Sequence, residues 1–343
     1  MRKLRIAQIG VRHEHADGKM NAVRLQMQDT FEVVGIAAES PKWQEKEKDN
    51  RAYKGLQWMS QEELLAIPDL DAVLVETEMT ELIDTAEKCF AKRLPIHIDK
   101  PGGSEELDRY AQLVNKYYEA NLPFQVAYMF RGHPYMKFAR KIAKSGVLGD
   151  VFELDANMHR NDTGRDDFRN WLAGYAGGAM FDYGSHLIDI AFEIFGAPEK
   201  VHCIRQRIIG DALYDNGVAL LEYKKATATL RSCMSTPGGG RKLSLRGTNG
   251  TLEIQPIEQT TDEEHRYPLF DDKPLVVKMD ILKDTPEYKA GKHEIPFHTT
   301  GRYIDQLEEF AAMLRGEVKN PYSAEYEITL QKLILAASGY IEW

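Results

Sequence analysis

The chain has 343 residues, a length that suits two domains at roughly 100 to 200 residues each. Hydrophobic residues make up 43% and charged residues 28%, ordinary values for a folded soluble protein that argue against a disordered chain. The net charge of -9, with scattered lysines and arginines, argues against a nucleic-acid partner, and no apolar run approaches the ~18 residues of a membrane span.

The cellular setting is predicted from the N-terminus and the cysteines. The apolar run Ile6–Ile9 in MRKLRIAQIG is shorter than a signal-peptide core of about 7 to 15 residues. Cys89, Cys203 and Cys233 are far apart and form no C-x-x-C pair, which argues against a disulfide framework and a zinc ribbon. We therefore expect a cytoplasmic protein whose cysteines are buried structural thiols.

The first third of the chain alternates short apolar runs with amphipathic stretches, which indicates βαβ units around a parallel sheet. The expected strands are Leu4–Ile9, Val33–Ala38, Ala72–Glu76, Pro95–Ile98 and Phe124–Tyr128. The expected helices are Lys19–Gln28, Gln61–Ala66, Thr80–Lys92 and Glu105–Ala120. A capping box at Ser60 and Glu63 supports the second helix. Residues 1–126 are thus predicted to form a doubly wound, dinucleotide-binding sheet of Rossmann type.

The remainder, residues 127–343, is predicted to be an α+β domain with a large, mostly antiparallel open sheet. Asn249-Gly250 between two alternating segments is a strong hairpin signal. The polar segment Glu258–Lys292 has no clear assignment. The expected strands are Val151–Met158, Val201–Ile209, Asn216–Tyr223, Ala226–Met234, Lys242–Gly247 and Thr251–Gln255. The expected helices are Tyr135–Ser145, Ala179–Phe195, Tyr303–Arg315 and Ala324–Ser338.

The stretch IAQIGVRHEHADGKM resembles a dinucleotide-binding loop but keeps only the first glycine of G-x-G-x-x-G. Arg12 and His15 stand at the other two glycine positions, so Gly10 fits either a cofactor loop or a plain strand-to-helix turn. Glu39 ends the second strand, where a carboxylate can bind the ribose hydroxyls and repel the 2'-phosphate of NADP. A solvated glutamate is the alternative; if a dinucleotide binds, NAD is favoured.

Three further patterns carry candidate chemistry. Lys100 follows the fourth strand in IHIDKPGG, at the sheet edge where open α/β sheets bind ligands, and could polarise a hydroxyl. Asp182 and His186 are spaced i, i+4, so on a helix the carboxylate could support the histidine as a proton acceptor. His13 and His15 form an H-x-H pair without an identifiable third ligand, so we predict no metal and second-shell or solvent-facing positions for them.

The chain resembles the glucose-fructose oxidoreductase and inositol dehydrogenase (Gfo/Idh/MocA) family over nearly its whole length. The resemblance rests on the motif order: the Rossmann-like N-terminus, IDKPGG, GGAMFDYGSHLIDIAFEIFG, LRGTNGTLEI and FAAMLRGEVKNPYSAEYEITLQKLILAASG. Asp99-Lys100-Pro101 is a conservative variant of the family's Glu-Lys-Pro. The family's G-G-x-x-x-D-x-G-x-H element is matched by Gly177, Gly178, Asp182, Gly184 and His186.

The resemblance implies an NAD(P)-dependent dehydrogenase that transfers hydride between nicotinamide and a secondary hydroxyl of a sugar, polyol or cyclitol. It makes Lys100, Asp182 and His186 the catalytic set. The residues expected to contact NAD are Gly10, Arg12, His13, Glu39, Thr77 and Lys100. The residues expected to face substrate are Arg131, His159 and Trp171, with His133, Asn157 and Arg169 as neighbours.

One departure from the family lies after the strand that ends at Glu76. Relatives often carry Thr-Pro-Asn and then a histidine there, whereas this chain has Thr77-Glu78-Met79 and Leu82. Glu78 would bring a negative charge near the nicotinamide half of the cofactor.

Two other functions stay open beside the dehydrogenase. Some relatives are glycoside hydrolases that use tightly held NAD in a cycle of oxidation, elimination and re-reduction, and others are non-catalytic regulators that bind cofactor or sugar. The resemblance also implies a homodimer or homotetramer, with a small carbohydrate or polyol as the partner.

Overall fold

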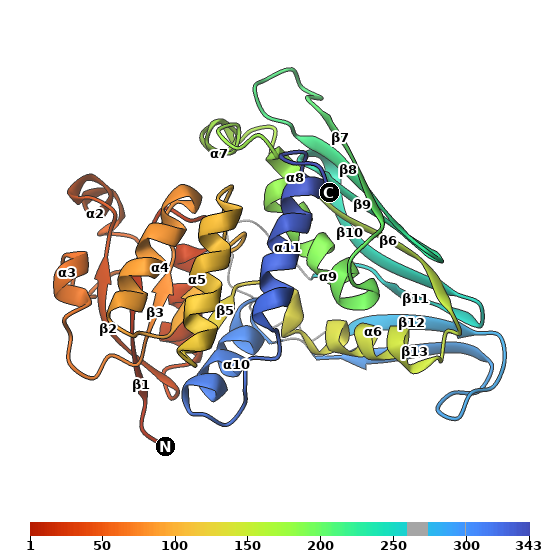
Figure 1. Ribbon diagram of the computed structural model, residues 1–343, viewed down its shortest axis with the longest axis horizontal. Coiled ribbons are helices and arrows are strands. Elements are labelled where there is room, and N and C mark those ends of the chain that lie inside the picture. Colours follow the sequence, from red (N-terminus) through yellow and green to blue (C-terminus); the bar gives the residue numbers. More distant parts are fainter. Residues whose placement is uncertain (259–273, 299) are drawn as a thin grey trace. The chain divides into compact units, whose positions relative to one another are not determined.

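The computed structural model describes residues 1–258, 274–298 and 300–343 (Figure 1). Among the helices of these residues, none combines the length and the apolar composition needed to cross a membrane. The cysteines in this part of the chain are free thiols; Cys89 is buried as expected, whereas Cys203 and Cys233 are partly exposed, because they lie on strands with only one covered face.

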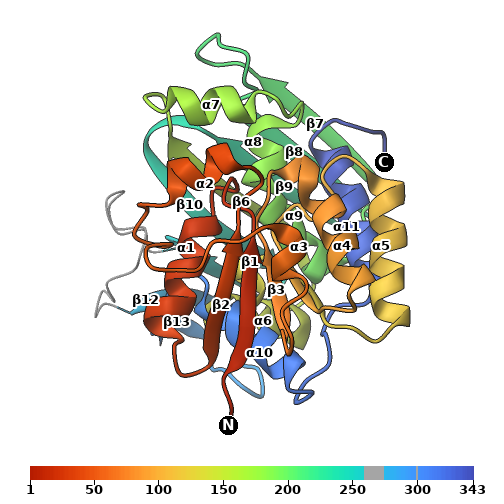
Figure 2. The ribbon, with the colours of Figure 1, turned by 90° about the vertical axis from the view of Figure 1, so that its left-hand side faces the viewer.

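Five parallel strands form the N-terminal sheet, in the order β2-β1-β3-β4-β5 (Figure 2). They are β1 (Leu4–Ile9), β2 (Phe31–Ala37), β3 (Ala72–Val75), β4 (Ile96–Ile98) and β5 (Phe124–Val126). Every residue of β3 is buried, as expected for a parallel strand covered on both faces. The strand order reverses between β1 and β3, which makes their carboxyl ends the topological switch point where such sheets bind ligands. The predicted Rossmann-type sheet is confirmed.

Helices cover both faces of this sheet. They are α1 (Ala16–Asn21) with the π-helical turn η1 (Ala22–Gln26), α2 (Pro41–Glu47), α3 (Gln61–Leu64), the 3-10 turn η2 (Met79–Glu81), α4 (Leu82–Ala91), α5 (Leu107–Glu119), the 3-10 turn η3 (Met129–Arg131) and α10 (Ile304–Leu314). Val23, Leu307 and Phe310 join the core on one face, and α4 and α5 pack on the other (Figure 2). The Ser60–Glu63 capping box is present, whereas α2 was not predicted.

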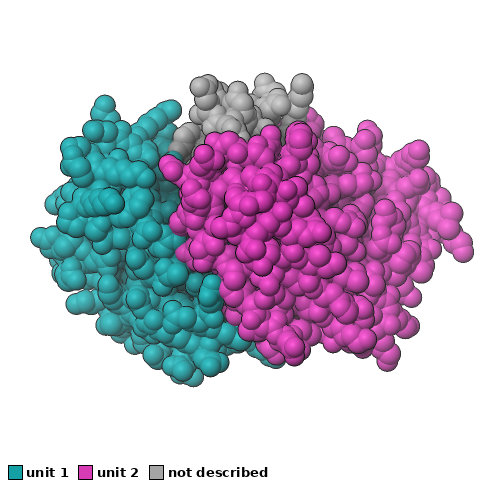
Figure 3. All heavy atoms as spheres, turned by 90° about the horizontal axis from the view of Figure 1, so that it is seen from above, with its two compact units in different colours: residues 1–132, 261–270, 300–328 teal, residues 133–260, 271–299, 329–343 magenta. Residues whose placement is uncertain are grey.

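The described residues divide into two compact units (Figure 3). The first unit contains residues 1–132 and 300–328, and the second contains 133–258, 274–298 and 329–343. The division is therefore not a single cut in the chain, because α10 follows the strands of the second unit and yet belongs to the first.

The second unit is built on an eight-stranded sheet, visible as the long green-to-blue strands of Figure 1, in the order β13-β12-β11-β10-β6-β9-β8-β7. Its strands are β6 (Val151–Asn161), β7 (Lys200–Gln206), β8 (Asn216–Tyr223), β9 (Ala226–Cys233), β10 (Ser235–Gly247), β11 (Gly250–Ile254), β12 (Leu275–Ile281) and β13 (Gly291–Phe297). All neighbours are antiparallel except β6 and β9. The predicted open sheet and the hairpin are confirmed; the two residues between the strands are Thr248 and Asn249, and Gly250 begins β11.

Two of these strands correct the sequence analysis. The segment Glu258–Lys292 had no assignment, yet β12 and the start of β13 lie in it; its residues 259–273 fall outside the described part. β12 alternates buried and exposed side chains, and the pattern was hidden by charged residues on its exposed face.

The helices of the second unit are α6 (Pro134–Ser145), α7 (Asp166–Leu172), α8 (Gly178–Asp182), α9 (Gly184–Phe195) and α11 (Ala324–Ala337), whose first turn groups with the first unit. α8 and α9 pack against β6, β8 and β9. α7 was not among the expected helices; Asp166 and Asp167 occupy its first turn, where the helix dipole favours acidic side chains.

Candidate active site

Gly10 makes the turn at the end of β1. Its φ of +102° is rare for residues with a side chain, and a Cβ added there would lie 2.2 Å from the backbone nitrogen of Thr77. Its N–H donates to the carbonyl of Ala37 at 2.8 Å. The glycine is therefore required by the close approach of β1 to the segment that follows β3.

The two amides after Gly10 point at one carboxylate. The N–H groups of Val11 and Arg12 donate to Glu39 at 3.2 Å each. Successive amides that converge in this way form an anion-binding nest. Burial raises the pKa of Glu39 above its ordinary value, and hydrogen bonds from backbone amides oppose the shift. Glu39 is thus partly buried and is held against the loop by the two amides.

The side chain of Arg12 turns to two acidic residues that follow β3. It forms ion pairs with Glu78 at 2.5 Å and Glu81 at 3.6 Å, and its guanidinium lies 5.1 Å from the ring centre of Trp43. Arg12 and Glu78 both depart from the family pattern, and in the folded chain each neutralises the other. The negative charge that Glu78 was expected to bring is therefore compensated locally.

A buried ionic network lies behind the loop. Lys19 Nζ donates to Glu76 Oε1 at 2.7 Å and to Asp99 Oδ2 at 2.6 Å, and the three side chains are at most 1% exposed. Burial lowers the pKa of Lys19, but the two carboxylates outweigh it and the net shift is upward. Burial raises the pKa of Glu76 well above its ordinary value, with Lys19 opposing.

The sequence analysis missed Lys19 and Glu76. The signal that could have found Glu76 is a carboxylate placed directly after the apolar strand AVLV. Lys19 offered no such signal, because it resembled an ordinary lysine near the start of a predicted helix.

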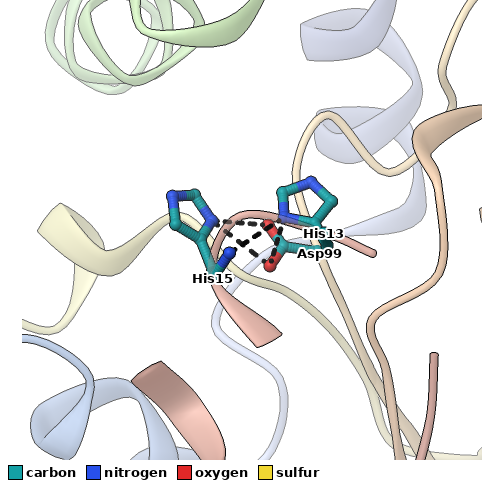
Figure 4. A group of neighbouring side chains, drawn as sticks. All are labelled: His13, His15 and Asp99. Carbon is teal, nitrogen blue, oxygen red and sulfur yellow. Dashed lines mark hydrogen bonds and ion pairs between the residues drawn. The ribbon is translucent and has the colours of Figure 1, made fainter. Parts of the chain in front are cut away.

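His13 and His15 both direct Nδ1 at Asp99 (Figure 4). The distances are 3.2 Å from His13 to Asp99 Oδ2 and 3.2 Å from His15 to Asp99 Oδ1. Both histidines are buried, so the expectation of solvent-facing rings is wrong; the loop folds back over the sheet edge instead. Burial lowers the pKa of His13 to about 3, so its ring is neutral at physiological pH. Asp99 is thus a third potential ligand beside His13 and His15, which the sequence analysis did not identify.

The proposed catalytic residues come from both units. Lys100 is fully buried in the first unit, and its backbone N–H donates to Asp99 Oδ1 at 2.6 Å. In the second unit Asp182 ends α8 and His186 lies in the first turn of α9, both buried. Tyr183 between the helices keeps helical angles of -77° and -38°, so the i, i+4 spacing falls on nearly continuous helix, as predicted.

Packing explains the glycines that surround Asp182 and His186. Gly178 has a φ of +50°, and a Cβ there would lie 2.2 Å from the carbonyl oxygen of Tyr214. A Cβ at Gly184 would lie 2.7 Å from Cε of Met180. These glycines allow α8 and α9 to pack closely against their neighbours. Asp182 and His186 are then the residues of the motif with side chains suited to proton transfer.

Arg131 forms its contacts with residues of the first unit. Its guanidinium bonds Glu327 through two contacts of 2.6 and 3.1 Å, and it lies 3.9 Å from the ring centre of Tyr322. Arg131 is 4% exposed and Glu327 1%. This bidentate, buried pair favours a structural role for Arg131 over contact with substrate.

The other expected substrate residues lie in the second unit. Buried Leu154 and Met158 face α9 from β6, so strand alternation places His159 on the opposite face of the sheet. Arg169 is buried and paired with Asp211 at 2.7 Å and Asp215 at 3.1 Å, which indicates a structural tie.

Trp171 and His133 both contact aromatic rings. Trp171 is partly buried on α7, between Phe168 and Tyr175. His133 is buried and stacks on Tyr135. Trp171 and His159 are thus the partly exposed members of the expected substrate set, whereas Arg131 is buried.

Comparison with known proteins shows similarity to one family. Residues 136–253 match the family model of the GFO/IDH/MocA C-terminal domain. The rhizopine catabolism protein MocA of Rhizobium meliloti is 27% identical over 129 residues, 37% of this chain and 38% of that protein. The scyllo-inositol 2-dehydrogenase (NADP(+)) IolW of Bacillus subtilis is 26% identical over 208 residues, 58% of this chain and 56% of that protein.

The matched segments thus span about half or less of these two curated relatives. Among solved structures, KijD10, a 3-ketoreductase from Actinomadura kijaniata in complex with TDP-benzene and NADP, superposes with a TM-score of 0.72. It is 18% identical, and the match covers 98% of each chain. At this identity the likeness establishes the fold.

Proposed function

We propose that this chain, a member of the Gfo/Idh/MocA family, is an NAD-dependent dehydrogenase of a secondary hydroxyl on a sugar, polyol or cyclitol. The observation that carries the proposal is the joint retention of Lys100, Asp182 and His186, each buried, in the family's two motifs. Asp182 and His186 both lie within the stretch that matches the family model.

The residues around Gly10 suit a dinucleotide. Gly10 brings the backbone close to the sheet edge, and the Val11 and Arg12 amides already hold an anion, the carboxylate of Glu39. The hydroxyl of Thr77 is buried and has no hydrogen-bond partner among the described residues, so it can receive a ligand group. The bound cofactor would supply the hydride acceptor.

The charges around the loop favour NAD over NADP. A 2'-phosphate near Glu39 would meet a carboxylate, and like charges repel. Arg12, the cation of the loop itself, forms ion pairs with Glu78 and Glu81. The name of IolW states NADP(+), so the preference for NAD that we propose for this chain differs from that relative.

We assign the protein's part in the reaction to three side chains. His186 takes the hydroxyl proton, a role that suits an imidazole because its ordinary pKa lies close to neutral pH. Asp182 orients His186 and balances the charge that it gains. The ammonium of Lys100 contacts the reacting oxygen and stabilises its developing negative charge.

Cyclitols are the first substrates to test, because the name of IolW states scyllo-inositol. A panel of inositols, hexoses and polyols would be incubated with enzyme and NAD, and NADH would be followed by absorbance. We expect NADH to form in step with oxidised product. His186→Ala should lower kcat by about a hundredfold or more while NAD affinity changes little.

The control is His202→Ala, which removes an exposed histidine of the same unit that lies on the edge strand β7 and pairs with Glu222. Product without accumulated NADH would favour the hydrolase cycle, and NAD binding without turnover on the panel would favour a regulator. An unchanged rate in His186→Ala would contradict the assigned role. Assembly into a homodimer or homotetramer stays a prediction.

A further inference from the structure

Three buried side chains converge on one point at the carboxyl edge of the N-terminal sheet. His13, His15 and Asp99 each offer one ligand atom, and these atoms lie within 4.8 Å of one another. We infer that they form a binding site for one divalent transition-metal ion, and that Zn²⁺ suits the ligands best. This inference goes beyond the proposed dehydrogenase and does not depend on it.

The spacing of the ligand atoms matches metal coordination. Zn²⁺ bonds to histidine nitrogen and carboxylate oxygen are about 2.0 to 2.1 Å long, so neighbouring ligand atoms of a tetrahedron stand about 3.3 Å apart. The Nδ1 atoms of His13 and His15 stand 3.2 Å from the oxygens of Asp99. The same distances lie at the upper end of the range for N–H···O hydrogen bonds, so metal uptake is the measurement that separates the two arrangements.

Neighbouring groups fix the ligands in place. Asp99 accepts hydrogen bonds from Lys19 Nζ and from the backbone N–H of Lys100, both at 2.6 Å. The other ring nitrogen of His15 lies 3.4 Å from a carboxylate oxygen of Glu14. A carboxylate behind a ligating histidine is the usual arrangement in metal sites, because it orients the ring and strengthens the ligand.

The oxygens of Asp99 have lone pairs for a further partner. Oδ2 accepts from Lys19 Nζ and Oδ1 accepts from the backbone N–H of Lys100. Each carboxylate oxygen can accept about two hydrogen bonds, so each keeps a lone pair for a metal ion. Buried carboxylates are stable when they are paired or bind a metal. Three protein ligands leave a fourth tetrahedral position for water or another oxygen ligand.

The test begins with the wild-type full-length chain. The protein would be stripped with a chelator, dialysed against Co²⁺ or Zn²⁺, and analysed for bound metal, with the Co²⁺ absorption spectrum as a report on coordination. We expect one ion per chain, a spectrum of a nitrogen- and oxygen-ligated tetrahedral site, and a higher melting temperature with metal. Stripped protein that takes up no metal would show that the cluster is a hydrogen-bonded network and would overturn the inference.

Variants then locate the ion. His15→Ala and Asp99→Asn should each lower Co²⁺ affinity by about a hundredfold or more, because removal of a ligand exceeds the 10- to 100-fold cost of losing a group behind one. His97→Gln is the control, since His97 is equally buried in the same sheet but bonds Gln125. If His15→Ala does not fold, Asp99→Asn, which keeps the side-chain shape, decides the question. Unchanged affinity in the cluster variants would assign the metal to another place and refute the site.

Discussion

Replacing Lys19 by methionine would remove the ammonium that donates to both Glu76 and Asp99. Its Nζ lies 2.7 Å from one carboxylate and 2.6 Å from the other, and all three side chains are almost fully buried. Methionine keeps most of the volume, so the change isolates charge from packing. The folded state would then hold two buried carboxylates without their cation.

The magnitude follows from the cost of an unpaired buried charge. Breaking such a pair costs about 3 to 5 kcal/mol, so we expect the free energy of unfolding to fall by about 4 kcal/mol at pH 7. Burial already raises the pKa of Glu76, and loss of Lys19 raises it further. The folded variant therefore binds a proton more tightly than the unfolded chain, and its stability falls as pH rises from the unfolded pKa to the folded one.

The deficit should therefore be smaller at pH 5 than at pH 7, because protonation of Glu76 removes the buried charge that has lost its cation. Glu76→Gln in the Lys19→Met background should restore part of the stability at pH 7 and flatten this pH dependence. Urea unfolding followed by circular dichroism at both pH values measures these quantities.

Lys116→Met is the control, because Lys116 is an exposed lysine of the same unit and should change stability by no more than about 0.5 kcal/mol. If Lys19→Met were as mild as this control at pH 7, or if its deficit were equal at pH 5 and pH 7, the charge argument would be refuted.

The remaining predictions concern ion pairs of the first unit. Glu39→Gln should raise NADP affinity relative to NAD roughly tenfold, measured by titration of both cofactors; equal preference in the wild type would remove Glu39 from cofactor selection. Arg12→Ala and Glu78→Gln should show a coupling of about 1 kcal/mol in a double-mutant unfolding cycle, and additivity would contradict their pairing. Arg131→Lys should lower stability by about 2 kcal/mol, because lysine cannot make the bidentate contact with Glu327; thermal unfolding tests this, and no loss would favour another role.

Local sequence patterns predicted most of the strands and helices. β1 was predicted with its observed bounds, because an apolar run between a charged start and a glycine indicates a parallel strand whatever it packs on. The hairpin between β10 and β11 was likewise predictable, because Asn249 and Gly250 favour a turn and lie between two alternating segments. α7 was not, because its helix depends on the packing of residues such as Leu172 more than on local sequence.

The sequence by itself determined the two sheets, the family motifs and the candidate chemical residues, because periodicity, turn residues and motif spacing are properties of neighbours in the chain. The tertiary structure determined which charged residues form ion pairs with one another. Arg12 finds Glu78, Lys19 finds Glu76, and the histidine pair finds Asp99 because parallel strands bring residues from successive βα segments to one sheet edge. Electrostatic partners are set by distance in space, and sequence separations from 57 residues (Lys19 to Glu76) to 86 residues (His13 to Asp99) leave no trace in local pattern.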